Sequence, residues 1–225
     1  MELSRYRALH LGIAPLRLRF AIPLAVVLSI AVVAALPASR HFVLRSAGHA
    51  LVAEDPSAHA DIVIVSTDSL SAGMLEAGDL VRAGLASRVA VFTREVSPLQ
   101  VELKRRGLPY LDLQEHELSL LRAMGVTNIE MIPPVVGTND EGDVLRNWCK
   151  AHSIHSVLFI SVVDHSRRTR RVLSRALGSE GIEVRVRLAR FSAFNPDTWW
   201  QTRNGQRVEA VEMQKLLLDF ARHPF

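Results

Sequence analysis

Short apolar segments alternate with longer helix-like segments throughout residues 60–225, and this alternation constrains the fold more than any other feature. The segments at 61–66 and 156–163 are rich in β-branched residues, as is typical of strands buried on both faces. Three of the helix-like segments end at a glycine, namely Gly84, Gly107 and Gly125. Strands that alternate with helices form a parallel sheet with helices on both faces. We therefore predict a three-layer α/β domain.

The same pattern gives bounds for each element. Strands are expected at residues 61–66, 88–92, 129–132, 156–163 and 182–188, with a short additional strand at 110–112. Helices are expected at residues 70–84, 98–106, 115–124, 138–152, 166–177 and 208–222. In such a sheet, ligands bind beyond the carboxyl ends of the strands. The residues that follow the strands are therefore the candidates for a functional site.

The formal net charge of +4 and the isoelectric point near 9.8 come from the N-terminal fifth of the chain. Residues 1–45 contain six arginines and one acidic residue, whereas the other 180 residues contain 21 basic and 22 acidic side chains. A nucleic-acid-binding domain needs a basic face on its folded part. The nearly neutral domain argues against a nucleic-acid partner, although residues 167–190 hold eight arginines and two glutamates.

Residues 20–39 form an uncharged stretch of 20 residues between Arg19 and Arg40. A helix of this length spans roughly 30 Å, the hydrocarbon thickness of a bilayer. Four arginines precede the stretch and two follow it closely, so the positive-inside rule predicts a cytoplasmic N-terminus and an extracytoplasmic, periplasmic domain. We expect a cytoplasmic segment at 1–19, a single transmembrane helix at 20–39, a linker at 40–59 and the α/β domain at 60–225. A cleaved signal peptide is the alternative, although residues 36–38 match its cleavage site poorly.

Two loops carry candidate ligand-binding side chains. The first strand runs into residues 66–69, which contain no glycine and therefore form neither a dinucleotide-binding loop nor a P-loop. Asp68 is the candidate here, and the alternative is that Asp68 or Ser69 caps the next helix. Thr138 and Glu141 open a later helix, where exposed amides could hold an anion. Their spacing also matches a capping box, which would explain both residues without a ligand.

The predicted strand at 156–163 leads directly into His165 and Arg168. An imidazole at a strand end can act as acid or base near neutral pH. Arg168 lies three residues further along the next helix and can hold a phosphate or carboxylate in a two-point contact. The alternative is that the arginines from Arg167 to Arg175 form a solvated helix or face lipid headgroups.

Other motifs give weaker signals. Trp199 and Trp200 follow a turn and could wall a pocket, or could pack the last helix onto the sheet. Cys149 is the single cysteine, which excludes a disulfide framework and a multi-cysteine zinc site. The closest approach to a metal-ligand spacing is His152 with His155, across a predicted helix-to-strand turn. There is no nucleophile elbow. The sequence therefore predicts no metal and no cofactor.

Four spaced motifs occur together in one order: Thr138-x-x-Glu141, Ser161-x-x-x-His165-x-x-Arg168, Pro196-x-x-Trp199-Trp200 and Glu212-x-x-Lys215. In this order and spacing the chain resembles the bacterial YdcF/SanA/ElyC domain family over roughly residues 60–222. The resemblance implies a Rossmann-like α/β domain, often behind one N-terminal membrane helix, and a link to cell-envelope integrity and to peptidoglycan or lipid-carrier metabolism. It also implies that Thr138, Glu141, His165 and Arg168 line a shared cleft.

The chain departs from that family at two places. The glycine-rich segments usual after the first two strands are replaced by residues 66–69 and 93–96, and no basic residue occurs between Asp61 and Val81. Our leading hypothesis is an extracytoplasmic, membrane-tethered envelope protein that binds an anionic, phosphate-bearing small molecule or lipid carrier. His165 and Glu141 would be catalytic, and the ligand would contact Asp68, Thr138, Ser161, Arg168 and Trp199. The alternative is a binding or scaffolding module without catalysis, and the sequence leaves oligomeric state open.

Overall fold

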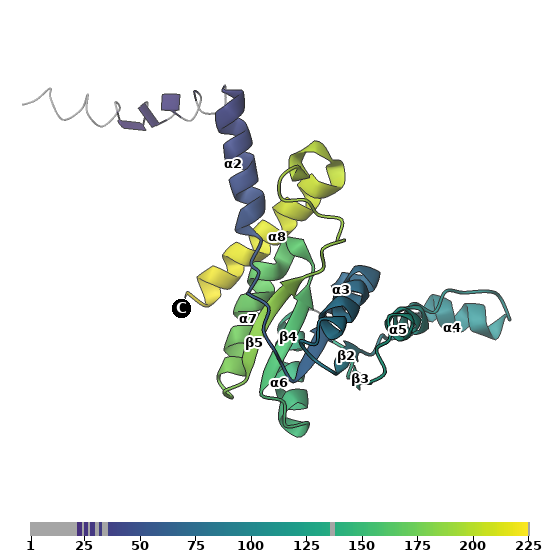
Figure 1. Cartoon of the computed structure of the whole chain (residues 1–225). Helices are drawn as coiled ribbons and strands as arrows, with labels where there is room; N and C mark the ends of the chain where they lie inside the picture. Colours follow the sequence, from purple (N-terminus) through teal and green to yellow (C-terminus); the bar gives the residue numbers. More distant parts are fainter. Residues whose placement is uncertain are drawn as a thin grey trace, which may run out of the picture. The chain divides into compact units, whose positions relative to one another are not determined.

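A computed structural model describes residues 22, 23, 25, 26, 28, 29, 32, 36–135 and 138–224, with only the backbone of Thr138 and Asn139. The chain divides into two compact units, Met1–Ser46 and Ala47–Phe225, and the second holds the α/β domain (Figure 1). Helix α2 covers Pro37–Ala50, where the sequence predicted the end of a membrane helix and a linker. The predicted transmembrane helix at 20–39 lies partly outside the described residues, which include 22, 23, 25, 26, 28, 29, 32 and 36–39 of this span. Within the described part, no helix is long and apolar enough to cross a membrane.

Five strands form one parallel sheet, which confirms the predicted α/β class. The strands are β1 (Ile62–Val65), β2 (Val89–Phe92), β3 (Ile129–Ile132), β4 (Ser156–Ser161) and β5 (Glu183–Leu188). Their order across the sheet is β3-β2-β1-β4-β5. The chain therefore runs outward from β1 in one direction and then returns to add β4 on the other side. A reversal of this kind marks the place where ligands bind in doubly wound sheets, and it falls between β1 and β4.

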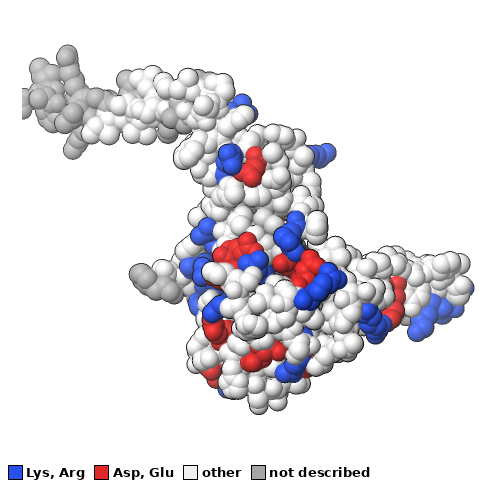
Figure 2. Space-filling model, viewed as in Figure 1, with Lys and Arg blue, Asp and Glu red and all other residues white. Residues whose placement is uncertain are grey.

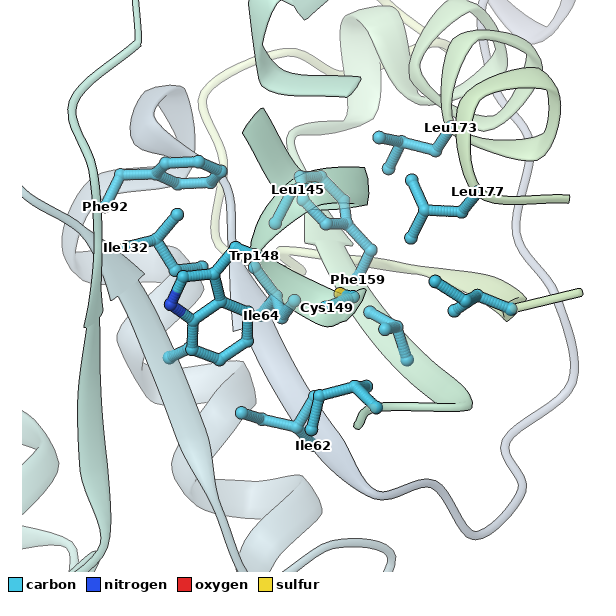
Figure 3. Close-up of a cluster of buried hydrophobic side chains, with 14 residues drawn as sticks. Ile62, Ile64, Phe92, Ile132, Leu145, Trp148, Cys149, Phe159, Leu173 and Leu177 are labelled. Atoms are coloured by element: carbon cyan, nitrogen blue, oxygen red, sulfur yellow. The ribbon is translucent and has the colours of Figure 1, made fainter. Parts of the chain in front are cut away.

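Helices cover both faces of the sheet. Helices α6 (Thr138–Ala151) and α7 (Ser166–Gly178) pack on one face, and α3 (Leu70–Arg82) and α5 (Leu113–Ala123) pack on the other. Successive side chains of a strand point to opposite faces, so β1 supplies Ile62 and Ile64 to the first core and Val63 and Val65 to the second. Figure 3 shows the first core, in which Phe159 of the sheet lies among Leu145, Leu173 and Leu177 of the covering helices. This arrangement is the predicted three-layer, Rossmann-like architecture.

The remaining elements lie around the ends of the sheet. They are α4 (Pro98–Arg105), α8 (Arg203–Arg222) and the short 3₁₀ turns η1 (Thr67–Ser69), η2 (Val163–His165) and η3 (Trp199–Gln201). A third, smaller core joins Leu51, Phe194 and Leu216. Through it, α8 is fixed against the segment that follows α2.

Two predicted elements differ most from the structure. Residues 110–112, all of them described, form no strand, because Asp112 instead caps α5 by accepting the amide hydrogen of Glu115 at 3.1 Å. Helix α8 begins at Arg203 rather than at Val208, because the hydroxyl of Thr202 caps the helix through the amide of Gly205 at 3.0 Å. Both differences come from cap geometry, which fixes a helix start more sharply than hydrophobic periodicity does.

Candidate functional site

The carboxyl ends of β1 and β4 lie side by side because these strands pair in parallel, with Val65 opposite Ile160. Beyond β1 the chain turns into η1, which carries Asp68. Beyond β4 it turns into η2, which carries Asp164 and His165. The strand order therefore brings two loops that are about 100 residues apart in the sequence to one place.

The His165 imidazole lies between two carboxylates. Its Nε2 is 3.6 Å from Oδ2 of Asp68, and its Nδ1 is 3.5 Å from Oδ2 of Asp164. Burial opposes ionisation of Asp164, but the interaction with His165 outweighs it and lowers the pKa of Asp164. The His165 ring is buried, whereas the Asp68 side chain is 63% exposed. A carboxylate on the Nδ1 side orients the ring and leaves Nε2 facing the exposed side of the site.

Glu141 comes from the first turn of α6 and is buried. It accepts a hydrogen bond from the backbone amide of Thr67, the residue before Asp68. Burial and the negative charge of Asp68 raise the pKa of Glu141 to about 8, although the Thr67 amide and Arg168 act in the opposite direction. Its Oε1 has no hydrogen-bond partner within the described part of the chain. At neutral pH this carboxyl group is largely protonated, so it can donate a hydrogen bond.

Arg168 projects from α7 and is largely buried, with 13% of its side chain exposed. One of its terminal nitrogens, Nη2, donates to Oε2 of Glu212 on α8 at 3.0 Å. Lys215, one turn further along α8, donates to the other oxygen of Glu212 at 2.6 Å. The guanidinium is therefore largely screened from solvent, and its positive charge also acts on the Glu141 carboxyl.

The structure thus brings together four of the predicted site residues, namely Asp68, Glu141, His165 and Arg168. The alternative was that Asp68 or Ser69 caps the next helix. Ser69 does occupy the N-cap position of α3, but among the described residues no side-chain hydrogen bond caps that helix, and the hydroxyl of Ser66 caps η1. The alternative capping box of Thr138 and Glu141 involves the Thr138 side chain, which lies outside the described part of the chain.

The other predicted ligand contacts lie differently. Ser161 is fully buried, and its hydroxyl donates to the carbonyl oxygen of Val162 at 3.2 Å and approaches Thr169 Oγ1 at 3.5 Å. Trp199 packs edge-on against Trp200 and against the third core, as in the packing alternative. Thr138 is the first residue of α6, and its side chain lies outside the described part.

The arginines of residues 167–190 bind partners inside the domain. Arg171 and Arg175 of α7 both bind Asp219 of α8, and Arg170 binds Asp55 after α2. Figure 2 shows that acidic and basic side chains are interspersed over the visible face of the domain. The predicted alternatives for this segment, a ligand site or a solvated or headgroup-facing helix, therefore miss its main structural role. Most of these arginines hold α7 and β5 to neighbouring elements.

One side-chain group has the composition of a metal site. Asp164, His165 and Glu212 each place one potential ligand atom within 4.8 Å of the others. However, both oxygens of Glu212 already bind cationic side chains, Arg168 and Lys215. A divalent cation would have to displace them and would then face two positive charges. We therefore assign no metal to this group.

Sequence reasoning missed Asp164, Glu212 and Lys215 as members of the site. The signal for the last two was present, because the spacing Glu212-x-x-Lys215 places both side chains on one helix face. Nothing in the spacing indicated that this face would pack against η2 and α7, as it does. For Asp164, its position directly before His165 at a strand end was the available signal.

No known protein-family model matches the chain, and no curated protein matches it. Among solved structures, a universal stress protein in complex with cAMP aligns with a TM-score of 0.35 and 16% identity, over 58% of this chain and 97% of that chain. An rRNA methyltransferase from Streptomyces viridochromogenes aligns with a TM-score of 0.28 and 15% identity, over 64% of this chain and 70% of that one. Likenesses of this degree carry no argument about function. The fold class rests on the observed strand order and pairing.

Proposed function

We propose that this chain is a membrane-anchored, extracytoplasmic protein of cell-envelope homeostasis whose domain binds an anionic, phosphate-bearing ligand where β1 and β4 meet. A phosphorylated lipid carrier and a phosphorylated glycan precursor of peptidoglycan share the chemistry that this site would recognise. The observation that carries the proposal is the convergence of Asp68, Glu141, His165 and Arg168 at the reversal of strand order.

Arg168, Lys215 and Glu141 would recognise the anion. Arg168 uses one nitrogen for Glu212, and a guanidinium has further N–H groups that can bind phosphate oxygens. Lys215 is half exposed and can move from Glu212 to a ligand. Protonated Glu141 can donate to a phosphate oxygen without adding a negative charge. The site thus offers three donors to an anion, although its resident carboxylates keep its total charge low.

His165 and Glu141 would supply proton transfer if the bound ester is cleaved. The imidazole can remove a proton from an attacking water or hydroxyl group, with Asp164 stabilising the imidazolium that forms. Glu141 can return a proton to the leaving oxygen, because an acid whose pKa lies near 8 is still protonated at neutral pH. Asp68 faces Nε2 from the exposed side and would move away from it when the ligand binds, which frees Nε2 to accept the proton of the attacking water or hydroxyl group.

The membrane anchor in this proposal rests on the sequence. An uncharged stretch of 20 residues flanked by arginines is long enough to span a bilayer, and the excess of arginine before it favours an extracytoplasmic domain. The other 180 residues carry nearly equal numbers of basic and acidic side chains, which argues against a nucleic-acid partner.

Binding of inorganic pyrophosphate to the detergent-solubilised full chain, measured by isothermal titration calorimetry, tests the anion site. We expect Arg168→Gln to weaken binding at least about tenfold, since a charge-assisted hydrogen bond is lost. Lys215→Ala, at a half-exposed position, should weaken it several-fold. Arg185→Ala is the matched control, because Arg185 pairs with exposed Glu183 on β5 and should leave binding unchanged. Unaltered binding in both folded site variants would contradict the proposal.

A non-catalytic binding module is the second candidate. The observation in its favour is that Glu212 already holds both Arg168 and Lys215, which makes a stable site without a substrate. Glu141→Gln and His165→Asn separate the two functions, because both variants keep the shape of the site but cannot transfer a proton. Complementation of a strain lacking the protein by both variants would favour the module, and failure of both, with pyrophosphate binding retained, would favour an enzyme.

A further inference from the structure

The segment from residue 95 to residue 113, which we name the arm, contributes to none of the three cores. Every residue of the arm is described, and none of them is buried. Helix α4 lies within it, and Figure 1 shows α4 projecting beyond α5, away from the sheet. Large apolar side chains of the arm are 38–69% exposed, namely Val96, Leu99, Val101, Leu108, Tyr110, Leu111 and Leu113. A monomeric soluble protein rarely exposes so many large apolar residues in one short segment, so this surface indicates a binding partner.

The arm is apolar but electrically balanced. It carries three basic residues, Lys104, Arg105 and Arg106, and three acidic residues, Glu95, Glu102 and Asp112. Glu102 binds both arginines, at 2.7 and 2.6 Å. Over the whole arm the basic and acidic residues are equal in number, so the apolar side chains are its dominant feature. A surface of this kind favours an apolar partner over a charged one.

The base of the arm is tied to the candidate site. The arm leaves the carboxyl end of β2, at the same edge of the sheet where η1 and η2 carry the site. Arg94 binds Glu117 of α5 through two hydrogen bonds of 2.9 and 2.6 Å, and it also donates to the carbonyl oxygen of Thr67 at 3.1 Å. The amide of the same Thr67 binds Glu141. One residue therefore links the base of the arm to the buried acid of the site.

We propose that the arm docks into the surface of a lipid bilayer and so places the candidate site beside the headgroups, where the phosphate of an amphiphilic ligand lies. This inference rests on the proposed function, since the predicted anchor at 20–39 would keep the domain next to a membrane. A bilayer fits the arm better than a second copy of the chain, because a projecting apolar segment enters lipid without a matching groove. Interfacial segments bury their apolar side chains about 5–10 Å deep, and a tyrosine such as Tyr110 suits the boundary.

Flotation with lipid vesicles tests the arm. Within the described part of the chain, every strand and all three cores lie in the unit Ala47–Phe225. This unit is used without the N-terminal segment, which would bind lipid by itself, and circular dichroism first verifies that it folds. We expect this unit to float with phosphatidylcholine vesicles and to remain bound in 0.5 M NaCl, because the charge of the arm is balanced. The double variant Leu99→Asp/Leu111→Asp should reduce the bound fraction at least about fivefold. The matched control is Leu217→Asp/Leu218→Asp, at positions of α8 that are similarly exposed.

Several results would overturn the proposal. They are an equal loss of vesicle binding in both double variants, binding only to anionic vesicles at low salt, and a concentration-dependent dimer that the arm variant abolishes.

A fluorescent dye on an introduced cysteine gives a second readout. The native Cys149 should not react with the dye, because it is fully buried and burial raises its pKa to about 12. An environment-sensitive dye on Leu111→Cys should shift its emission to the blue on addition of vesicles, whereas the dye on Leu218→Cys should not. The absence of a shift at residue 111 would contradict docking.

The same samples separate this proposal from the anion site. The arm variant should bind pyrophosphate like the wild type, and Arg168→Gln should float like the wild type. If vesicle binding fails while pyrophosphate binding holds, the arm proposal alone is wrong. If pyrophosphate binding fails while vesicle binding holds, the proposed function is wrong.

Discussion

At the scale of single residues, the most unusual group is the Glu141 carboxyl. Burial favours its neutral form, and the nearby charge of Asp68 adds to this effect, so its pKa rises from 4.5 to about 8. Burial also raises the pKa of Glu209 to about 7, and both Glu209 oxygens lack a hydrogen-bond partner among the described residues. Both groups bind a proton more tightly in the folded state than in the unfolded chain. They therefore make stability depend on pH in one direction.

This gives a prediction for the pH dependence of unfolding. Between pH 4.5 and about 8 the unfolded chain releases the Glu141 proton that the folded protein retains, so the free energy of unfolding falls as pH rises. A shift of one unit corresponds to about 1.4 kcal/mol. Urea unfolding at pH 6 and pH 8.5 should show lower stability at the higher pH, and Glu141→Gln should flatten that difference. An equally steep dependence in Glu141→Gln would show that Glu141 does not cause it.

At the scale of elements, one carboxylate holds two helices together. Asp219 of α8 forms ion pairs with Arg171 and Arg175 of α7. The guanidinium of Arg171 also lies 3.7 Å from the centre of the Phe220 ring. Burial opposes ionisation of Asp219, but the two arginines outweigh it and lower its pKa. The stabilisation is therefore present above pH 3.8 and is lost as pH falls through the lower, folded-state pKa.

We expect Asp219→Asn to reduce the free energy of unfolding by about 2 kcal/mol, because two partly buried guanidinium groups lose their anionic partner. Chemical denaturation at pH 7 measures the change. Glu183→Gln is the control, since it removes an exposed pair with Arg185 and should change stability by less than about 0.5 kcal/mol. Equal effects of the two substitutions would contradict this role of Asp219.

Two helical glycines lead to opposite predictions for the same substitution. In an exposed helix position, Gly→Ala stabilises by about 0.5–1 kcal/mol, and Gly178 at the end of α7 has open space where a methyl group would lie. At Gly205 of α8 a methyl group would collide with the carbonyl oxygen of Trp199 and with the hydroxyl of Thr202. We expect Gly178→Ala to raise the thermal midpoint and Gly205→Ala to lower stability by about 2 kcal/mol. Differential scanning calorimetry measures both, and a stabilising Gly205→Ala would show that this turn relaxes freely.

The helices and strands also show which parts of the fold could be predicted from the sequence and which could not. The five strands were predictable because β-branched runs such as Ile62–Val65 leave few alternatives, and the position of Asp68 and His165 at strand ends followed from the strand rule alone. Glu212 and Lys215 could not be placed, because they belong to a helix whose docking depends on ion pairs distant in the sequence. The false strand at 110–112 arose because the aromatic and apolar residues of the arm have strand-like composition but no sheet to pack against.

At the scale of the whole molecule, the charge distribution separates the chain into two parts. The N-terminal fifth carries the excess of arginine, whereas the domain balances its charges, largely through ion pairs between elements. The sequence predicted that the arginines of residues 167–190 bind an anionic ligand or face lipid headgroups. In the structure, most of them form ion pairs with carboxylates of the same domain. Arg168 remains the member of that segment that faces the candidate site.

The division into two units gives the last prediction. Within the described part of the chain, the strands and the residues of the three cores lie in Ala47–Phe225. A chain that begins at Ala47 should therefore unfold cooperatively, with a thermal midpoint within about 3 °C of the full chain in detergent, and should bind pyrophosphate with unchanged affinity. Leu51→Ala in the same shortened chain is the control for sensitivity, since loss of a fully buried leucine costs about 2–5 kcal/mol.

A shortened chain that unfolds gradually, or that loses pyrophosphate binding while folded, would mean that the first 46 residues complete the domain or its site. Stability and binding that survive the truncation would instead assign residues 1–46 to a separate task, for which the uncharged stretch at 20–39 suggests anchoring in a membrane.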